Sequence, residues 1–578
     1  MILQALTRYY EDLLTRGEIA APGWSPAKIS FALCLDENGA VIQVIPTMQE
    51  VVAGKKTVRR PQEIVLPAAV KRTVGVASNF LWDNSTYLLG VDQKGKPARS
   101  RECFQAAAQL HHAILDGVES PAARAILAFF DTWDPSMAAE HPALRASFDE
   151  ITGSANLVFR VDSAYPQDDP AIRAAWQTHR DGGDPNAVRL QCLVTGREDE
   201  ISATHPAIKG VRDAQSSGAA LVSFNAPAFC SYGREQNYNA PVGKHAAFAY
   251  TAALNHLLAD KSRVQTIGDT TVVCWAEGAE PVYQDYAQAF LFGGETPKGL
   301  SDNDLRAALK RLADGKPCDD LGVDPNRPFY ILGLAPNAAR LSVRFFLRDT
   351  FGRLMRNVNA HYERLRIVGS RYEMLPLWAM LRETVNLNSR DKSPAPAMAG
   401  ATARAVFSGG PYPVALLEGV MLRIRAERNV TWGRAAIIKA YYLKNPHTDC
   451  PEEVLTVSLN EASTNIPYTL GRLFSVYEAT QQTANPGINT TIKDKYFNSA
   501  AAMPASIFPV LNNLYQKHLR KLETGQRVYF DKQVSTLKGV LGESYPTRMT
   551  LAQQGSFDLG YYHQTQKRYT KKEENENV

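Results

Sequence analysis

The 578-residue sequence lacks the patterns that mark a secreted, membrane-spanning or zinc-centred protein. Its seven cysteines are scattered, odd in number and never form a CxxC pair, which argues against a disulfide framework and structural zinc and fits a reducing compartment. No apolar run approaches the length of a membrane span. The N-terminal stretch MILQALTRYYEDLLTRG predicts an amphipathic helix and lacks the features of a signal peptide. We therefore expect a cytoplasmic protein with no membrane partner.

The sequence also lacks a recognisable phosphate-binding loop and a cluster of metal ligands. The stretch GGETPKG at residues 293–299 is Gly-rich but has no terminal Gly-Lys-Ser/Thr. His111, His112 and Asp116 invite a metal-nuclease interpretation, because the last two share one face of a predicted helix. Two ligands on one helix do not make a metal site, and the sequence offers no second clustered set. We predict no metal, no cofactor and no catalytic residue.

Length and charge set the outer limits of the interpretation. A chain of 578 residues predicts two to four domains with sizeable cores. The formal net charge of +5 is too small by itself to indicate a nucleic-acid partner. Any such partner must be visible as local clustering of basic side chains.

We expect an α+β fold, in which a mixed α/β N-terminal region precedes an all-helical C-terminal bundle. Residues 28–52 combine an apolar run, an Asp-Glu-Asn-Gly turn and a β-branched run, which predicts a hairpin. Pro, Gly, Ala and Ser dominate residues 386–413, a composition typical of a linker. The predicted domains are therefore 1–270, 271–385 and 414–578, with the linker before the last.

The stretch from Leu221 to Gly243, LVSFNAPAFCSYGREQNYNAPVG, combines aromatic and amide side chains in an unusual way. It opens as a short apolar strand and then has too many Asn, Gly, Pro and Ser residues for an ordinary helix or strand. Rings offer stacking faces, and amides offer both donors and acceptors. The composition suits contact with nucleic acid, although an Ω-loop packed by its own aromatic side chains would share it.

Residues 55–101 form a basic region, with ten Lys or Arg against three acids. Within it, a Lys71-Arg72 pair precedes Asn79, Phe80 and Trp82. Lys and Arg attract phosphates, whereas Asn and Thr can contact base edges. The region therefore indicates a nucleic-acid surface, with a solvated basic face as the alternative.

A second basic feature is the run from Arg340 to Arg348, whose residues alternate with period two. The alternation predicts a strand with Leu341, Val343, Phe345 and Leu347 on one face and Arg340, Ser342, Arg344, Phe346 and Arg348 on the other. Arginines beside a phenylalanine form a platform suited to phosphates and stacked bases. A cross-strand ladder of ion pairs is the alternative.

Four long stretches of the sequence carry a family resemblance: SNFLWDNSTYLLG, the Leu221–Gly243 stretch, FYILGLAPNAARLSVRFF and LNEASTNIPYTLGRLFSVYEATQQTANPGINTTIKDKYFNSAAAMPASIFPVLNNLYQKHL. Together they resemble the large subunit of the type I-C CRISPR surveillance complex, Cascade. The resemblance runs from the first residue almost to the C-terminal tail. It implies a subunit near the 5′ handle of the guide RNA that recognises the protospacer-adjacent motif, helps open the duplex and holds the displaced strand. Such a subunit is not itself thought to be a nuclease.

The resemblance also implies a set of partners in a prokaryotic cytoplasm. These are guide CRISPR RNA, target double-stranded DNA, the displaced single strand, the backbone and handle-capping Cascade subunits, and a helicase-nuclease recruited in trans. A small subunit would be translated from inside the same gene, starting near Met421 or around Val454–Val457.

We assign candidate contacts on residue type and clustering. The candidate motif-reading residues are Lys71, Arg72, Thr73, Asn79, Phe80, Ser223, Asn225, Tyr232, Gln236, Asn237 and Tyr238. The candidate contacts to the nucleic-acid backbone are Lys55, Lys56, Arg59, Arg60, Arg234, Arg340, Arg344 and Arg348. Phe80, Tyr232 or Tyr238 would act as wedge or stacking residue, and substitution of Asn79 or Asn225 by Ala would weaken motif discrimination.

Two other functions are compatible with the sequence. One is a nuclease or RNA-processing enzyme built on His111, His112 and Asp116, or on His245 with Tyr238. The other is an architectural scaffold whose basic patches serve only assembly. Metal-dependent cleavage by the isolated protein would support the nuclease, and motif-independent DNA binding would support the scaffold.

Overall fold

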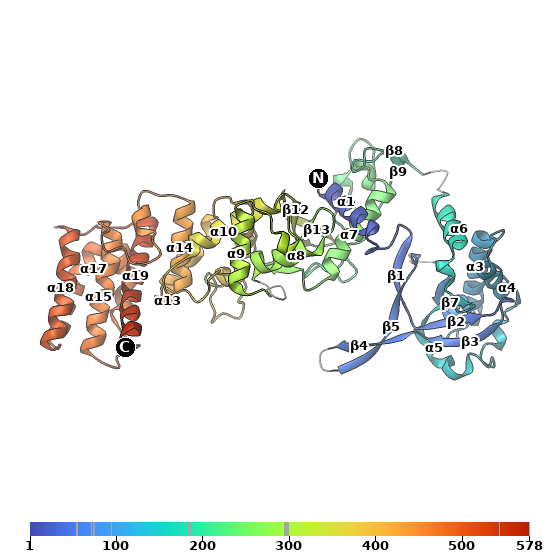
Figure 1. The fold of residues 1–578 in the computed structure, drawn as a ribbon, viewed down its shortest axis with the longest axis horizontal. Coiled ribbons are helices and arrows are strands. Elements are labelled where there is room, and N and C mark those ends of the chain that lie inside the picture. Colours follow the sequence, from blue (N-terminus) through green and yellow to red (C-terminus); the bar gives the residue numbers. More distant parts are fainter. Residues whose placement is uncertain are drawn as a thin grey trace. The chain divides into compact units, whose positions relative to one another are not determined.

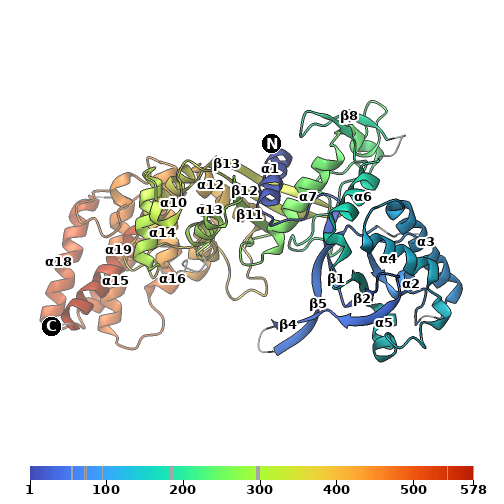
Figure 2. The ribbon, with the colours of Figure 1, turned by 45° about the vertical axis from the view of Figure 1, so that its right-hand side comes forward.

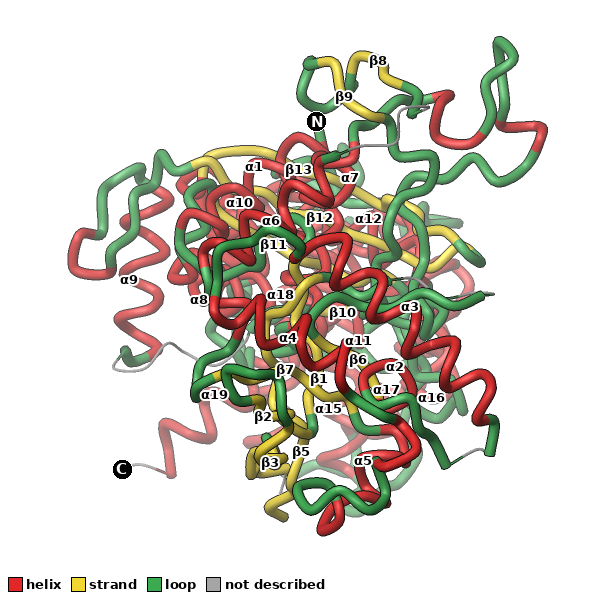
Figure 3. The backbone as a smooth tube through the Cα atoms, turned by 90° about the vertical axis from the view of Figure 1, so that its right-hand side faces the viewer, coloured by secondary structure: helices red, strands yellow, loops and turns green. Residues whose placement is uncertain are grey.

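The computed structural model describes residues 1–53, 56–70, 72, 75–93, 95–182, 187–293, 300–542 and 544–576. The structure is about 50% helical and 16% strand, which confirms the α+β fold. Figure 3 shows the helices in red and the strands in yellow. The chain forms two compact units. The N-terminal unit consists of residues 3–204 and 224–252, and the C-terminal unit consists of residues 205–223 and 253–578.

The N-terminal unit contains the sheets that lie early in the chain (Figure 1). Its elements are α1 (Ile2–Thr15), β1 (Trp24–Ile29), β2 (Phe31–Leu35), β3 (Val41–Pro46), β4 (Met48–Ala53), β5 (Lys56–Pro67), β6 (Trp82–Asn84), α2 (Ser85–Leu88), α3 (Pro97–Leu115), α4 (Pro121–Thr132), α5 (Phe148–Ser154), β7 (Asn156–Val161), α6 (Pro170–Asp181), β8 (Arg189–Gln191) and β9 (Glu198–Glu200). The helix α7 (Lys244–Ala259) begins in this unit and ends in the C-terminal unit.

The predicted hairpin at residues 28–52 is confirmed in β2 and β3, which pair antiparallel from Phe31↔Pro46. The carboxylate of Asp36 closes the turn, because its Oδ1 accepts hydrogen bonds from the backbone nitrogens of Asn38 and Ala40 at 2.9 and 2.8 Å. Strand β2 also pairs in parallel with β7, which gives a four-stranded sheet of order β3-β2-β7-β6. Its buried face packs with α3 and α4 in one apolar core.

A second sheet of order β1-β5-β4 leads out of this core. Strand β5 is 12 residues long, and its second half pairs with β1. Its first half pairs only with β4, so that β4 and β5 form a two-stranded ribbon extending away from the four-stranded sheet (Figure 2). Among the described residues, no further strand pairs with either edge of the ribbon. Such edges leave backbone donors and acceptors that another chain can pair with.

The C-terminal unit combines a four-stranded sheet with helices, of which α8 and α9 lie between its second and third strands in sequence and the others follow its last strand. Its elements are β10 (Gln265–Ile267), β11 (Thr270–Ala276), α8 (Pro281–Ala287), α9 (Asp302–Ala313), β12 (Pro328–Asn337), β13 (Arg340–Thr350), α10 (Phe351–Leu365), α11 (Leu377–Arg382), α12 (Pro396–Ser408), α13 (Val414–Glu427), α14 (Trp432–Lys444), α15 (Ile466–Ala484), α16 (Ile492–Ala502), α17 (Pro504–Leu519), α18 (Thr524–Leu541) and α19 (Leu551–Glu576). The strands form an antiparallel sheet of order β10-β11-β12-β13.

The linker predicted at residues 386–413 is wrong, because α12 occupies most of it. Met398, Ala399 and Phe407 are buried in the same apolar cluster as the sheet and the later helices. The sequence itself supplies the reason: Pro396 is at the helix start, alanines favour the interior, and Gly409 adopts a positive φ at the end. Alanine and proline here specify a closely packed helix.

The predicted boundary at residue 270 also differs from the structure, in which the units divide within α7 and residues 205–223 join the C-terminal unit. The sheet and the helices beyond it share one core, which extends from Ile267 to Tyr562. The helical region expected after residue 413 is present, but it packs directly on what precedes it.

Helices α15 and α19 approach each other closely at two glycines. A Cβ atom on Gly471 would lie 2.0 Å from the carbonyl oxygen of Phe557, and one on Gly560 would lie 2.0 Å from that of Tyr468. Only glycine permits such backbone contact between helices. No helix in the described part of the chain is long and apolar enough to cross a membrane.

Candidate nucleic-acid interface

The Leu221–Gly243 stretch is a loop stabilised by short helical turns. The apolar strand predicted at its start is wrong, because the backbone makes only a single parallel bridge, Ala220↔Arg340, before leaving the sheet. Two 3₁₀ turns follow, at Pro227–Phe229 and Gln236–Asn239. Ser223 belongs to the C-terminal unit, whereas the loop from residue 224 onwards belongs to the N-terminal unit.

The loop reaches its tip at Tyr232, whose side chain is fully exposed. Tyr232 and Gly233 both have positive φ, at 53° and 68°. The backbone nitrogen of Arg234 donates to the carbonyl oxygen of Ser231 at 3.0 Å, which completes a turn of the type I′ pattern. A bulky residue with positive φ is uncommon and costs about 1–2 kcal/mol. A strained, exposed tyrosine is therefore a sign of function rather than of packing.

The side chain of Asn239 fixes this turn from within the loop. Its Oδ1 accepts a hydrogen bond from the backbone nitrogen of Ser231 at 2.8 Å. Its Nδ2 donates to the carbonyl oxygens of Arg234 and Gln236 at 2.8 and 2.9 Å. The tip is thus preorganised by three hydrogen bonds to one amide, and Tyr232 is presented on a closed loop.

The remaining loop candidates divide into exposed and buried side chains. Asn225, Arg234 and Gln236 are exposed, and Tyr238 is half-buried. Asn237 is 2% exposed, and its backbone nitrogen donates to the carbonyl oxygen of Ala203 at 3.3 Å. The predicted motif contact by Asn237 is therefore wrong, since its amide is enclosed by the fold.

Arg72 and Asn79 both make hydrogen bonds within their own segment. Arg72 donates to Asp83 from both terminal nitrogens, at 3.1 Å for Nη1 to Oδ1, and from Nε to the carbonyl oxygen of Ala77 at 2.6 Å. Asn79 Oδ1 accepts from the backbone nitrogen of Val70 at 2.9 Å, and Asn79 is 5% exposed. The prediction that Asn79 reads the motif is wrong, because its acceptor is used internally.

Asp83 shows how strongly this segment is closed. Burial raises the pKa of the Asp83 carboxyl, and hydrogen bonds from Arg72 and the backbone of Asn79 oppose the rise. Arg72 also lies 4.0 Å above the Tyr87 ring. A guanidinium held by a buried carboxylate and an aromatic face has little freedom to follow a phosphate.

The wedge role predicted for Phe80 is wrong as well. Phe80 is 1% exposed and stacks on Trp176, with ring centroids 5.2 Å apart and an interplanar angle of 17°. Its other neighbour is His111 at 5.1 Å. Phe80 is therefore a core residue. Its nearness to the Lys71-Arg72 pair in the sequence does not determine whether its ring faces the solvent or the core. Lys55, Lys71 and Thr73 lie outside the described residues.

The β4–β5 ribbon exposes two of the predicted backbone contacts. Arg59 and Arg60 are exposed and alternate in direction, since Arg59 pairs with Glu50 and Arg60 pairs with Gln49 across the ribbon. One face therefore carries an opposite-charge pair and the other carries Arg60 beside an amide. Lys56 begins β5. A twisted two-stranded ribbon of this kind fits the major groove of a DNA duplex.

The arginine platform predicted on β13 is divided by a β-bulge. Strands β12 and β13 pair Gly333 with Phe345 but Leu334 with Val343, so Arg344 has no residue opposite it. One extra residue inverts the alternation on the far side of the bulge. The predicted grouping of side chains on two faces is therefore wrong.

The three arginines of β13 consequently have different surroundings. Arg344 donates from Nη2 to Asp269 at 2.6 Å and lines a groove of about 520 Å³ beside α12. Arg348 lies 5.9 Å above the Tyr330 ring, on the face where Tyr330 stacks on Trp275 at 5.2 Å. Arg340 lies beyond the bulge and, by the inverted alternation, on the opposite face from Arg348.

The histidines that invited an enzymatic interpretation have structural partners. His111 is fully buried, its Nε2 accepts from the backbone nitrogen of Leu81 at 3.0 Å, and burial lowers its pKa to about 4. His112 bridges Asp116 and Asp131 at 3.0 Å each. His245 pairs with Glu11 at 2.8 Å. Within the described residues, no three His, Cys, Asp or Glu side chains converge as a metal site would require.

The comparison with known proteins decides the family. A family model described as CRISPR-associated protein (Cas_Csd1) matches residues 6–569. The chain belongs to this family. The match makes the protein a CRISPR-associated component of the Cascade type. No curated protein matches the chain.

Sequence reasoning missed two features of this Cas_Csd1 family member that bear on its candidate sites. Asn239 was visible as one amide among several, and only the fold shows that it holds the turn. A pocket in the C-terminal helices assembles side chains from residues 461 to 568, and no contiguous motif connects them. Spacing along three different helices carries no signal for such a pocket.

Proposed function

We propose that the chain is the large subunit of a type I-C CRISPR RNA-guided surveillance complex. In this proposal it recognises the protospacer-adjacent motif, helps open the target duplex, stabilises the displaced strand and recruits a helicase-nuclease in trans. It binds nucleic acid without cleaving it. Its partners are guide CRISPR RNA, target DNA, the backbone and handle-capping subunits and a small subunit made from its own C-terminal region.

The observation that carries the proposal is the exposed Tyr232 on its fixed turn. Guide pairing supplies most of the sequence specificity in such complexes, so the protein needs only a short readout beside the duplex. An aromatic side chain on a rigid tip can enter between base steps, and exposed amides in the same loop can contact base edges. Gln236 and Asn225 supply such amides, and Arg234 supplies a positive charge for phosphate.

The β4–β5 ribbon supports the same function independently. Arg59 and Arg60 would bind duplex phosphates by a salt-dependent, sequence-independent attraction. Such contacts position the protein, whereas the loop tip reads the motif. Loss of the ribbon arginines would therefore weaken binding to intact and scrambled motifs equally.

The C-terminal helices support the small-subunit part of the proposal. Met421 is a buried residue inside α13, so a start there would divide a helix and leave a core residue at its end. A start at Val454–Val457 would keep α15 to α19 complete, with the close α15–α19 packing at Gly471 and Gly560. We infer that the later start gives the better-folded product.

A binding experiment on the assembled, guide-loaded complex tests the function. The affinity for a matched duplex is measured with the flanking motif intact and with the motif scrambled. The proposal predicts that scrambling lowers the affinity of the wild-type complex strongly. Equal affinities would support a scaffold that serves only assembly, and metal-dependent cleavage of DNA by the purified chain would support a nuclease.

A further inference from the structure

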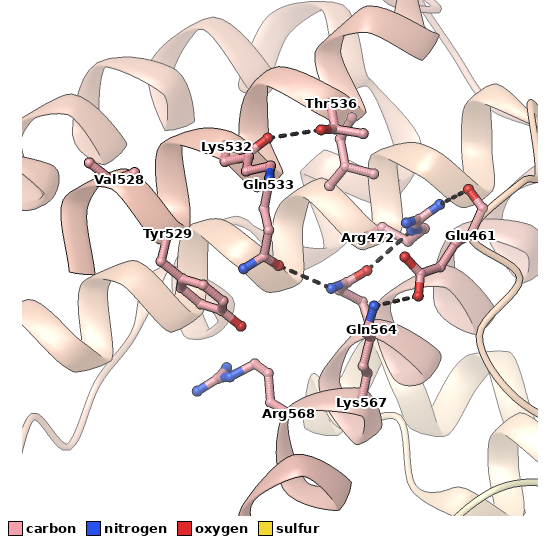
Figure 4. A pocket seen from close by; sticks show the side chains of 11 residues that line it. Glu461, Arg472, Val528, Tyr529, Lys532, Gln533, Thr536, Gln564, Lys567 and Arg568 are labelled. Carbon is pink, nitrogen blue, oxygen red and sulfur yellow. Dashed lines mark hydrogen bonds and ion pairs between the residues drawn. The ribbon is translucent and has the colours of Figure 1, made fainter. Parts of the chain in front are cut away.

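The C-terminal helices enclose a pocket that neither the motif-reading loop nor the ribbon uses. It lies between α18 and α19 beside the start of α15, and its cavity volume is about 350 Å³ (Figure 4). Cavities that bind small ligands measure roughly 300–1,000 Å³. The pocket is therefore large enough for one ligand of nucleotide size.

The floor of the pocket is a fixed chain of polar groups. Arg472 is 6% exposed, and its Nη1 donates to the carbonyl oxygens of Asn460 and Glu461 at 3.4 and 3.3 Å. Its Nε donates to Gln564 Oε1 at 3.2 Å, and Gln564 is 5% exposed. Gln564 Nε2 then donates to Gln533 Oε1 at 3.4 Å.

This chain leaves a hydrogen-bond donor directed into the cavity. The amide oxygen of Gln564 accepts from Arg472, and the amide oxygen of Gln533 accepts from Gln564. The last group in this series of hydrogen bonds is therefore Gln533 Nε2, which points toward the Tyr529 ring in Figure 4. A donor held in one orientation by a buried arginine suits an acceptor on the ligand, such as a base carbonyl oxygen.

The walls of the pocket are basic. Lys532 and Arg568 line it, and Arg568 donates from Nη2 to Gln482 Oε1 at 3.4 Å. Among the described residues that line the pocket, Glu461 is the one acid, and Lys567 is paired with it. The excess of positive charge favours an anionic ligand, and the guanidinium and ammonium donors fit phosphate oxygens.

Tyr529 provides an aromatic wall. Its side chain is 52% exposed and lies at the mouth of the pocket, beside Arg568 in Figure 4. An exposed ring next to a cation is the arrangement on which single-stranded nucleic acid stacks its bases.

We propose that this pocket binds one nucleotide of single-stranded nucleic acid, with its base stacked on Tyr529 and facing Gln533 and its phosphate on Lys532 and Arg568. The proposal rests on the proposed function, since a displaced single strand is the ligand that such a complex would present. An acidic peptide shares the charge but offers no planar ring to stack, so the combination of ring, fixed amide and cations favours the nucleotide.

Photocrosslinking of the full-length chain tests the proposal. The probe is a fluorescein-labelled 15-nucleotide oligothymidylate carrying 5-iododeoxyuridine, and the readouts are its dissociation constant and the crosslinked peptide. We expect crosslinks on the α18 peptide that contains Tyr529. Tyr529→Ala should raise the dissociation constant about 5- to 150-fold, the range for one lost base–aromatic stack, and Tyr529→Phe should restore most of the affinity.

The matched control is Tyr569→Ala, because Tyr569 on α19 is 53% exposed and does not line the pocket. Its affinity for the oligonucleotide should equal that of the wild type. Crosslinks outside α18, together with an unchanged dissociation constant for Tyr529→Ala, would overturn the pocket assignment. An oligoglutamate of the same charge is tested in the same way. If it bound as tightly as the oligonucleotide and Tyr529→Ala weakened both equally, the nucleotide assignment would be overturned and an acidic peptide would be indicated.

The two proposals fail separately. Motif discrimination is measured on duplex DNA with the guide-loaded complex, whereas the pocket is measured on single strands with the chain alone. A complex that discriminates motifs while Tyr529→Ala binds oligothymidylate normally would retain the proposed function and lose the pocket. If scrambling the motif had no effect but the crosslink to the Tyr529 peptide formed, the pocket assignment would be retained and the proposed function would be lost.

Discussion

Asn239 Oδ1 accepts a hydrogen bond of 2.8 Å from the backbone nitrogen of Ser231, across the base of the turn that presents Tyr232. The same amide donates to the carbonyl oxygens of Arg234 and Gln236. The positive φ of Tyr232 is maintained by these contacts, because a bulky residue would otherwise leave that conformation. The hydrogen bond between Asn239 and Ser231 therefore fixes the position of Tyr232, the exposed side chain that we propose contacts the motif.

Substitution of Asn239 by Ala should release the tip without unfolding the protein. Each net hydrogen bond is worth about 1 kcal/mol, and the lost order should weaken binding to the intact motif by roughly 3- to 10-fold. Binding to a scrambled motif should change little. The measurement is duplex affinity of the guide-loaded complex, with the thermal midpoint of the variant as control. A parallel loss for both duplexes would show that the loop contributes no motif discrimination.

Substitutions at Asn79 and Phe80 should act on stability rather than on recognition. Phe80→Ala removes a ring stacked on Trp176 in the core and should cost about 3–5 kcal/mol. Asn79→Ala removes the acceptor of the hydrogen bond from the backbone nitrogen of Val70 and should cost about 0.5–1.5 kcal/mol. Chemical denaturation measures both losses. If folded Asn79→Ala complexes bound intact and scrambled motifs equally, the buried asparagine would have a recognition role after all.

Glycine substitutions should separate helix packing from helix propensity within one bundle. Gly471→Ala places a Cβ atom against the Phe557 carbonyl of α19 and should destabilise the C-terminal unit by about 1–3 kcal/mol or more. Gly539→Ala on α18 is the matched control, because a Cβ atom there meets no heavy atom within 4 Å. It should leave stability unchanged or raise it by about 0.5–1 kcal/mol. Equal effects would contradict the close α15–α19 contact.

Buried imidazoles should make both units sensitive to acid. Burial lowers the pKa of His111 to about 4, of His563 to about 4 and of His361 to about 3. Between pH 6.5 and 4 the unfolded chain binds more protons at these positions, so stability falls as the pH falls. The loss from pH 7 to 5 should be about 2 kcal/mol for each of these groups. Thermal midpoints measured from pH 7 to pH 5 test the direction, and constant midpoints would contradict it.

His112, the neighbour of His111 in sequence, should have the opposite effect on the pH dependence of stability. Hydrogen bonds to Asp116 and Asp131 raise its pKa, so its contribution is present below the unfolded pKa near 6.5 and is lost as the pH rises through the folded value. His112→Gln should therefore steepen the acid-induced loss in the N-terminal unit. A shallower pH profile in this variant would show that the two carboxylates do not stabilise the charged imidazole.

The sequence allowed several local elements to be predicted because local patterns determine them. The β2–β3 hairpin follows from the Asp36 turn, and the β13 strand follows from its period-two pattern. The bulge at Arg344 could not be predicted, since one extra residue changes the register without changing the composition. The Ala-rich segment 396–408 resembled a linker because close packing and flexibility both favour small residues.

For the candidate site, the structure shows only which of the predicted side chains are accessible. Tyr232, Gln236, Arg234 and Asn225 are exposed in the loop where the aromatic and amide pattern placed a contact surface. Their neighbour Asn237 is buried, because successive side chains of a 3₁₀ turn point about a third of a turn apart, and that of Asn237 faces the fold. Residue type alone does not distinguish an amide that faces a ligand from one that completes a turn.

The most direct test of the central claim compares wild-type, Tyr232→Ala and Tyr232→Phe complexes on intact and scrambled motif duplexes. We expect scrambling to weaken binding by the wild type strongly. The Ala variant should bind both duplexes about equally, and the Phe variant should keep most of the discrimination because it keeps the ring. If the Ala variant discriminated as well as the wild type, the loop tip would not be the motif reader.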